Sequence, residues 1–371
     1  MFSPANQVHF ALTIDGLEQD FQVLAFTGEE GINRPYLFNI ELLSQRSDLD
    51  LQSFFDRQAF LAFDNQGNGV HGRIYHLAQS ANGRYHLALV PHLSYLRHRI
   101  NQRIYQGFSV PKIIALILEE HGILGEAYRF DLAASYPERD CCTQYEETDL
   151  HFIQRLCEEE GIHFHFRHSA QGHVLVFADR QAAFPRIEQP GRCAMQRSHG
   201  AYHQAEGQSQ QTGLASGHVL DIGEHQDRQW NDLWLLTQVS HEGRQPQVPG
   251  ESLGAGNSGA EDDGYQGYRN RFQVRPWSQL YRPPLTHRKP QVPGSQSAIV
   301  IALEDRERQA GRVKVRFPWD REGRFDDKSS CWLQMASDCP GEPLSMGMEV
   351  LVTFVENDPD RPLLGGCLLG R

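Results

Sequence analysis

Two histidines in the stretch HFHFRH are the first candidates for metal chemistry. His163 and His165 alternate with Phe164 and Phe166, so both imidazoles face the same side of a predicted strand. Imidazoles at this spacing can bind zinc, but such a site needs three or four ligands, and the sequence nominates no convincing third. The alternative is a half-buried strand with its polar face turned to solvent. We adopt that interpretation and expect no metal-binding residue.

Cysteine is the next candidate, as a nucleophile. Cys141 and Cys142 are adjacent, and Cys157 follows His151, a possible base, by six positions. Cys157, however, lies on the apolar face of a predicted helix, where a small thiol is buried and inert. The chain has no Gly-x-Ser-x-Gly elbow, no His-Glu-x-x-His motif and no phosphate-binding Walker loop. We therefore expect no catalytic residue, no cofactor-binding residue and no cofactor.

Carboxylates are concentrated around the same predicted helix. They are Glu146, Glu147, Asp149, Glu158, Glu159 and Glu160. Paired carboxylates can act as general acid and base. Three of them precede or begin the helix, where its dipole favours negative charge, and the other three form its last turn. This placement favours a solvated face over a catalytic pair.

The stretch RVKVRFPWDREG, residues 312–323, alternates basic and apolar side chains before it breaks at a proline. The basic residues Arg312, Lys314 and Arg316 share one face and the apolar ones share the other. A basic strand in a small barrel can bind oligonucleotides. Acidic residues at positions 320, 322, 326 and 327 would repel a phosphate backbone. We predict a barrel strand whose apolar side chains face the barrel core and whose basic side chains face solvent. The chain is predicted to leave the barrel at Trp319 and Asp320.

The bulk properties indicate a globular chain of two or three domains. The chain has 371 residues, a net charge of −12 and a hydrophobic fraction of 39%. The acidic balance argues against a general nucleic-acid binder. Seven cysteines without any Cys-x-x-Cys pair indicate free thiols made in a reducing cytoplasm. The first residues do not form a signal peptide, and no apolar run is long enough to span a membrane.

The elements that must position these residues are mainly strands. The first hundred residues alternate with period two between Gly/Asn turns. Helices are predicted over 109–122, with Ser109 as N-cap, and over 148–161, with Thr148 as N-cap. A hairpin follows over 162–179, and residues 185–215 are either a connection or a reduced subdomain. A proline-punctuated linker over 279–296 leads to five short strands, which predict an OB-type barrel. The fold class is mainly β with a few helices (α+β).

Several segments of the sequence resemble a known family. The segments GRVKVRFPWDREG, SSCWLQM and GMEVLVTFVENDPDRPLLGG are similar to the OB-fold portion of VgrG, the spike of the bacterial type VI secretion system. The segments SVPKIIALILEEHGI, CCTQYEETDLHFIQRLCEEEGIHFHFRH and NDLWLLTQVSHEGRQPQV resemble other parts of that family. The resemblance covers nearly the whole chain.

The resemblance implies an architecture and a set of partners. Residues 1–290 correspond to a phage tail-hub module of β-barrel domains with helical insertions, and residues 291–371 to the OB-fold domain of a phage baseplate spike. The family forms a homotrimer that matches the Hcp tube hexamer, carries a PAAR-type tip protein and effectors, and binds no nucleic acid. It is made in the cytoplasm of a Gram-negative bacterium and exported by the secretion system, puncturing a membrane only transiently.

The sequence departs from the family pattern in three places. It lacks the C-terminal β-helix, it is short near residues 187–205, and its OB segment is abbreviated before Gly311 and between Met335 and Gly347. The main expectation is a non-enzymatic structural protein of the secretion spike. One alternative is a tail hub or spike of a contractile phage or pyocin, an enzyme is a further one, and a more distant one is an OB-fold nucleic-acid binder.

Overall fold

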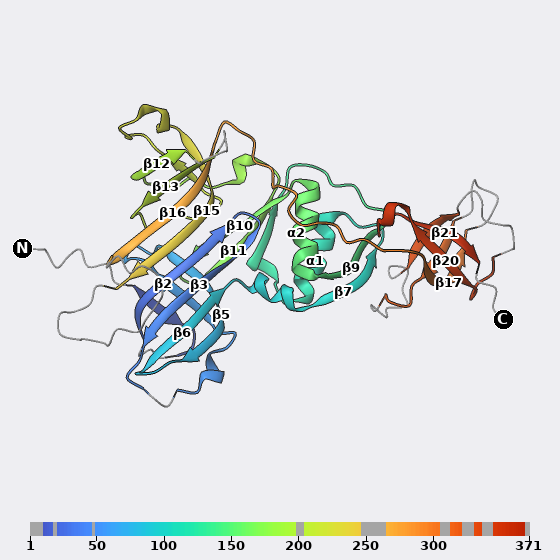
Figure 1. Cartoon of the computed structure of the whole chain (residues 1–371), viewed down its shortest axis with the longest axis horizontal. Coiled ribbons are helices and arrows are strands. Elements are labelled where there is room, and N and C mark those ends of the chain that lie inside the picture. Colours follow the sequence, from blue (N-terminus) through green and yellow to red (C-terminus); the bar gives the residue numbers. More distant parts are fainter. Residues whose placement is uncertain are drawn as a thin grey trace, which may run out of the picture. The chain divides into compact units, whose positions relative to one another are not determined.

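The computed structural model describes residues 10–17, 21–46, 49–197, 204–245, 265–304, 312–320, 330–335 and 344–367. The chain divides into two compact units (Figure 1). The first, called the sheet unit, comprises Met1–Ser94, Leu124–Ala133 and His163–Pro283, and the second, called the barrel unit, comprises Tyr95–Ile123, Ala134–Ile162 and Pro284–Arg371. The chain therefore passes between the units five times.

The sheet unit is built around an eleven-stranded sheet in the order β1-β4-β5-β6-β3-β2-β15-β16-β13-β12, with β14 paired to β15. Its strands are β1 Ala11–Ile14, β2 Gln22–Gly31, β3 Arg34–Leu43, β4 Gln58–Ala62, β5 Gly69–Gln79, β6 Arg84–Val90, β12 Cys193–Arg197, β13 Ala205–Ser209, β14 Val219–Asp221, β15 Leu233–Arg244 and β16 Gly267–Pro276. The antiparallel pair β2–β15 joins the N-terminal strands to the later ones. The segment 185–215 thus supplies two strands, β12 and β13, at one end of the order.

Glycines opposite phenylalanines fix the register of this sheet. Gly28 on β2 lies opposite Phe38 on β3, and Gly243 on β15 lies opposite Phe26 on β2. A Cβ atom at Gly28 would approach the Phe38 ring to 2.1 Å, and one at Gly243 would approach the Phe26 ring to 2.2 Å. Each ring covers the backbone of the opposing glycine, so a larger residue cannot replace it without displacing the ring.

A smaller sheet of three strands, β10-β11-β8, completes the sheet unit, with β8 Tyr128–Asp131, β10 His163–Ser169 and β11 Gly172–Ala178. The predicted hairpin over 162–179 is confirmed by the antiparallel β10–β11 pair. The β2–β3 turn docks onto β10 through Asn33, which adopts a positive φ of 61°. Its backbone N–H donates to the Phe164 carbonyl at 2.9 Å, and its side-chain oxygen accepts from the Phe164 N–H at 2.8 Å. An asparagine suits this place because it tolerates the left-handed region.

The barrel unit begins with a two-stranded ribbon, β7 Ile100–Tyr105 and β9 Cys142–Thr148, and two helices, α1 Val110–Glu120 and α2 Asp149–Glu160. Both helices were predicted, and the caps of α2 are as expected. The hydroxyl of Thr148 accepts from the His151 N–H, and Gly161 ends α2 in the left-handed region. Ser109 precedes α1, although its side chain makes no capping hydrogen bond.

Five short strands close into the predicted barrel in the order β17-β18-β19-β21-β20. Their bounds are β17 Gln296–Leu303, β18 Val313–Arg316, β19 Cys331–Met335, β20 Glu349–Phe354 and β21 Pro362–Cys367. Val313, Val315 and Phe317 are buried in the barrel core, as the alternation predicts. The prediction that the outer face of β18 is exposed to solvent is wrong at Lys314. This side chain is only 5% exposed, because its ammonium lies over the Trp332 ring, 5.6 Å from the ring centroid.

The prediction of a solvent-facing side for β10 is also wrong. His163 and His165 are 1% and 0% exposed. The His163 ring stacks on Phe184 with centroids 4.0 Å apart, and Gly217 lies directly against the His165 side chain. Segments distant in sequence therefore cover the face that alternation assigned to water.

More histidines are buried on the neighbouring strands of the same unit. His168 on β10 lies opposite His173 on β11, whose Nδ1 is 3.1 Å from Nδ1 of His71 on β5. Burial lowers the pKa of His173 to about 3 and that of His163 to about 4, so these side chains are neutral at pH 7. None of the described residues forms a cluster of three or more side chains arranged to hold a metal ion.

Membrane insertion by a helix receives no support from the described residues. None of their helices combines the length and apolarity that crossing a bilayer requires.

The sheet unit should lose stability under mild acid. A histidine whose folded pKa lies below its unfolded value of about 6.5 stabilises the fold fully above that pH, and the contribution falls as the pH drops towards the folded pKa. For His163 the loss between pH 7.5 and pH 5 is about 2 kcal/mol. Hydrogen exchange of peptides covering β10 and β11, corrected for the intrinsic rate, should therefore show weaker protection at pH 5. A His163→Phe variant should show a flatter pH dependence, and equal protection at both pH values would contradict this explanation.

Candidate functional site

The candidate site is a junction within the barrel unit, where the β7–β9 ribbon meets the turn before β21. The Thr143 N–H donates to Oδ1 of Asp360 at 2.5 Å, and the Thr143 hydroxyl donates to the Pro359 carbonyl at 2.9 Å. Lys289, in the linker, contributes an ammonium 2.6 Å from Oδ2 of Asp360 and 2.7 Å from Oδ1 of Asp358. Burial opposes the Lys289 charge, but these two carboxylates raise its pKa. Ribbon, linker and barrel turn are thus held by one set of charged hydrogen bonds.

An aromatic contact forms the second part of the junction. The Trp319 ring stacks on Phe317, with centroids 4.8 Å apart, and meets the Tyr145 ring of β9 edge-on at 5.6 Å. The Trp319 indole N–H donates to the side chain of Gln296, which in turn donates to the Tyr145 hydroxyl at 3.0 Å. The turn after β18, which the sequence predicted to be only an exit from the barrel, therefore anchors the barrel to β9.

The third part involves the end of β7. The Gln106 side-chain amide donates to the Ser330 carbonyl at 2.7 Å and accepts from the Trp332 N–H at 3.1 Å. Ile104 of β7 is 6% exposed and packs in the same apolar cluster as the barrel core. Apolar burial and hydrogen bonds therefore act together along this contact.

Behind the ribbon, three of the six carboxylates predicted to be solvated, Glu147, Asp149 and Glu158, are instead buried, whereas Glu146 and Glu159 are exposed. Arg155 on α2 is 1% exposed and binds Glu147, which is 6% exposed, through NH2 to Oε1 at 2.6 Å. The same guanidinium binds Glu159 at 2.9 Å and the Thr143 carbonyl at 3.2 Å. The helix is thereby tied to the residue that receives the barrel turn. For Glu147 the prediction of a solvated face is wrong, because the buried guanidinium of Arg155, eight positions later in the chain, provides its partner.

Asp149, at the start of α2, is fully buried and is the centre of a second network of polar side chains. Gln144 donates to its Oδ1 at 2.8 Å, and Nε2 of His121 lies 2.7 Å from its Oδ2. Burial opposes the ionised form, but these hydrogen bonds and the guanidinium charge of Arg103 hold the pKa of Asp149 well below its usual range. A permanently ionised carboxylate of this kind supports structure and is unsuited to exchange protons at neutral pH.

The end of α2 holds the start of the linker. Glu158 accepts from the backbone N–H groups of Thr286 and His287, at 2.7 and 2.8 Å, and from the Thr286 hydroxyl at 2.7 Å. Burial opposes its charge, yet these hydrogen bonds lower the pKa of Glu158. The proline-punctuated linker was predicted correctly as irregular, but it is fixed to the helix and to the barrel turn.

The cysteine candidates are not activated. Burial raises the pKa of Cys142 and Cys157 far above the ordinary value, so neither is a thiolate at neutral pH. His151, the predicted base, binds Glu147 through Nδ1 at 2.6 Å. The structure therefore brings no cysteine–histidine pair together at the positions that the sequence nominated.

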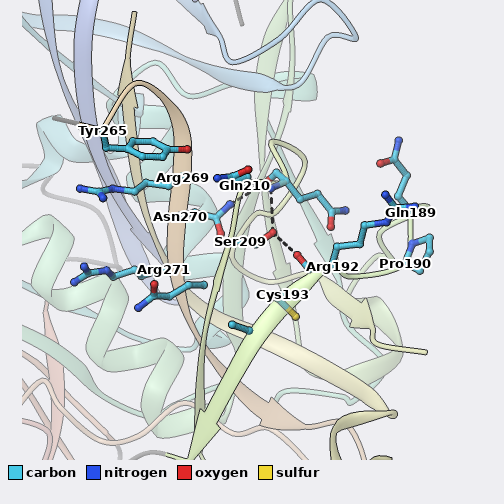
Figure 2. A pocket seen from close by; sticks show the side chains of 13 residues that line it. Gln189, Pro190, Arg192, Cys193, Ser209, Gln210, Tyr265, Arg269, Asn270 and Arg271 are labelled. Carbon is cyan, nitrogen blue, oxygen red and sulfur yellow. Dashed lines mark hydrogen bonds between the residues drawn. The ribbon is translucent and has the colours of Figure 1, made fainter. Parts of the chain in front are cut away.

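The sheet unit also contains a cavity of about 850 Å³ beside β12, β13 and β16 (Figure 2). In Figure 2 the Tyr265 ring lies next to the Arg269 guanidinium, which is 4.7 Å from the ring centroid, and the same arginine binds Glu242 at 2.8 Å. The described residues that line the cavity carry amide, hydroxyl, guanidinium and thiol groups, apart from Pro190 and Ala194, and include no carboxylate or imidazole. Burial raises the pKa of the Cys193 thiol there to about 11. Those lining residues thus offer no general acid–base pair.

Removal of the buried guanidinium tests the network behind the ribbon. Arg155→Met should lower the free energy of unfolding by about 3 to 5 kcal/mol, because the buried Glu147 carboxylate would lose its guanidinium partner. The double variant Glu147→Gln/Arg155→Met should lose less, since it leaves no unpaired charge. Urea denaturation followed by circular dichroism measures both, and a single variant as stable as the double one would refute the role given to this ion pair.

Comparisons with known proteins agree with the geometry. The family model described as phage tail baseplate hub (GPD) matches residues 29–202, and that described as type VI secretion system/phage-baseplate injector OB domain matches residues 296–369. The type VI secretion system spike proteins VgrG4b and VgrG5 of Pseudomonas aeruginosa are 47% and 43% identical to the chain, and each match covers 99% of it. The chain spans 57% and 58% of the length of these relatives. Both alignments run over 459 positions, more than the 371 residues of the chain, so the relatives carry internal segments that it lacks.

Solved structures give the same result. The Escherichia coli c3393 protein superposes on this chain with a TM-score of 0.79 at 25% identity, and the match covers 96% of this chain and all of that one. That protein is described as a component of the type VI secretion system with structural similarity to T4 bacteriophage tail proteins gp27 and gp5. The VgrG-containing Francisella PdpA–VgrG complex shares the fold, with a TM-score of 0.61 at 6% identity over 94% of this chain and 67% of that one. Sequence and fold agree along almost the whole length, and the chain belongs to the VgrG family of type VI secretion system spike proteins.

Proposed function

We propose that the chain acts as the hub and barrel of a trimeric secretion spike, a non-enzymatic adaptor between the Hcp tube hexamer and a membrane-puncturing tip. The observation that carries the proposal is the composition of β17. Ala298 and Val300 are buried in the barrel core, whereas Ile299, on the other side of the strand, is 38% exposed. A barrel strand that is apolar on both sides favours a second chain as its outer cover.

The junction supports the mechanical part of the proposal. A spike transmits force along its length, so its parts must not yield independently. Within the barrel unit, the Asp360 and Trp319 contacts hold the barrel to the ribbon and to α2, and the chain passes five times between the two units. Load is therefore carried by several covalent segments and a charged, partly dry contact.

The remaining assignments belong to the same proposal. The division at residues 290 and 291 separates a hub module from an OB module, and the two family matches lie on either side of it. The tip protein of the PAAR type and its effectors would bind beyond the barrel. The chain would be made in the cytoplasm of a Gram-negative bacterium and exported through the secretion system, without binding nucleic acid. The close spike relatives favour this role over that of a contractile phage or pyocin.

The trimer can be tested directly by light scattering. The chain at micromolar concentration should have three times the mass of one copy, and Ile299→Asp should shift it to a monomer because a carboxylate would be buried against the neighbouring copy. Leu285→Asp serves as a matched control, since Leu285 is 76% exposed in the linker and away from the barrel strands. A wild-type chain that remains monomeric, or a Leu285→Asp variant that dissociates as readily as Ile299→Asp, would count against the proposed interface.

The coupling of linker, ribbon and barrel can be tested by proteolysis. Asp360→Ala removes the acceptor for Thr143 and Lys289, and should weaken the junction by about 2 kcal/mol. Trypsin cleavage after Arg288 should then accelerate at least about tenfold, because the linker opens more often. Arg361→Ala is the matched control. Arg361 is 57% exposed and makes only a long ion pair with Glu356, at 3.6 Å, so its removal should change the cleavage rate by less than about twofold. Unchanged cleavage of the Asp360→Ala chain would remove the junction from the mechanism.

A further inference from the structure

A pair of cysteines meets inside the junction, although 190 positions separate them in sequence. The Sγ atoms of Cys141 and Cys331 are 3.6 Å apart. Cys141 directly precedes β9, and Cys331 begins β19 of the barrel. The Cys331 side chain is fully buried, whereas Cys141 is half-buried.

We infer that Cys141 and Cys331 are a redox pair that closes to a disulfide when the protein meets an oxidising disulfide compound. A disulfide is about 2.0 Å long, so side-chain rotation has only a short gap to close. The β18–β19 pairing holds Cys331 in place, and the hydrogen bonds to the barrel turn hold Thr143, two positions after Cys141. The fold thus prepares the approach of the two sulfurs before any bond forms.

The chemistry balances with a small disulfide, such as oxidised glutathione, as the oxidant. The half-buried Cys141 loses a proton and attacks one sulfur of the oxidant, whose S–S bond breaks and releases one thiol. Cys331 then loses its proton and attacks Sγ of Cys141, forming the protein disulfide and releasing the second thiol. The protein loses two electrons and two protons, and the oxidant becomes two thiols.

The pair is expected to stay reduced in a reducing cytoplasm. Burial and the hydrogen bond from Cys331 raise the pKa of Cys141, which slows attack by its thiolate. In an oxidising compartment outside the cytoplasm the disulfide would accumulate and join the ribbon covalently to the barrel. Only the place where the oxidant is met rests on the proposed function, because the thiol chemistry depends on the two side chains alone.

The test uses a chain in which Cys193, Cys339 and Cys367 are replaced by serine, so that the half-buried thiols of Cys193 and Cys367 and the thiol of Cys339 do not compete. The reduced protein is incubated with oxidised glutathione, blocked with N-ethylmaleimide and digested without reductant. Mass spectrometry should find a cross-link between the peptides that contain Cys141 and Cys331, with the loss of about 2 Da that a disulfide requires. The melting temperature should rise by at least about 5 °C and return after reduction, because the bond closes a long loop.

Three single-residue variants decide which thiols react. Cys142→Ser is the matched control, since Cys142 is adjacent and buried, and it should leave the cross-link intact. Cys141→Ser and Cys331→Ala should each abolish it. The inference is overturned by a stable glutathione adduct on Cys141 without a cross-link, or by a cross-link that still forms in Cys141→Ser. It is also overturned if both thiols, with Cys141 and Cys331 intact and the chain folded, stay reduced during the whole incubation. A chain that forms the disulfide but remains monomeric would contradict the proposed spike role and leave the redox pair standing.

Discussion

The hydrogen bond from the Thr143 amide to the Asp360 carboxylate is the constraint on which the barrel unit depends. It joins a strand of the ribbon to a turn 217 positions later in the chain. The Asp360 carboxylate also binds the Lys289 ammonium, so the linker cannot separate from the barrel turn without breaking this ion pair. On the other side of Thr143, its carbonyl accepts from Arg155 at 3.2 Å. Thr143 and Asp360 together therefore connect helix, ribbon, linker and barrel.

This arrangement places charged groups where an apolar contact would also have been possible. Buried ion pairs contribute little net stability because their desolvation offsets their attraction, but removal of one partner is costly. A junction built this way resists small rearrangements, since every alternative packing leaves a buried charge without a partner. We regard this specificity as the reason for Arg155, Glu147 and Asp149 at the ribbon, and the stiffness that results is what the proposed spike role would require.

The elements could be predicted from local patterns, whereas most of the site could not. The caps of α2, the β10–β11 hairpin and the five-stranded barrel follow from turn residues and alternation near in sequence. The junction involves partners such as Thr143 and Asp360 that no local period relates, although both lie in segments that resembled the family. Alternation also failed for His165 and Lys314, because it indicates which side chains share a face and cannot indicate what covers that face.

The central claim is that ribbon and barrel open as one body. Native-state hydrogen exchange of the wild-type chain in low concentrations of guanidinium chloride tests it most directly, with peptides covering β9, β18 and β19. We predict that the three peptides share one free energy of opening and one dependence on denaturant. A barrel whose strands exchange with a lower free energy than β9 would contradict the account, because it would show that the junction does not couple them.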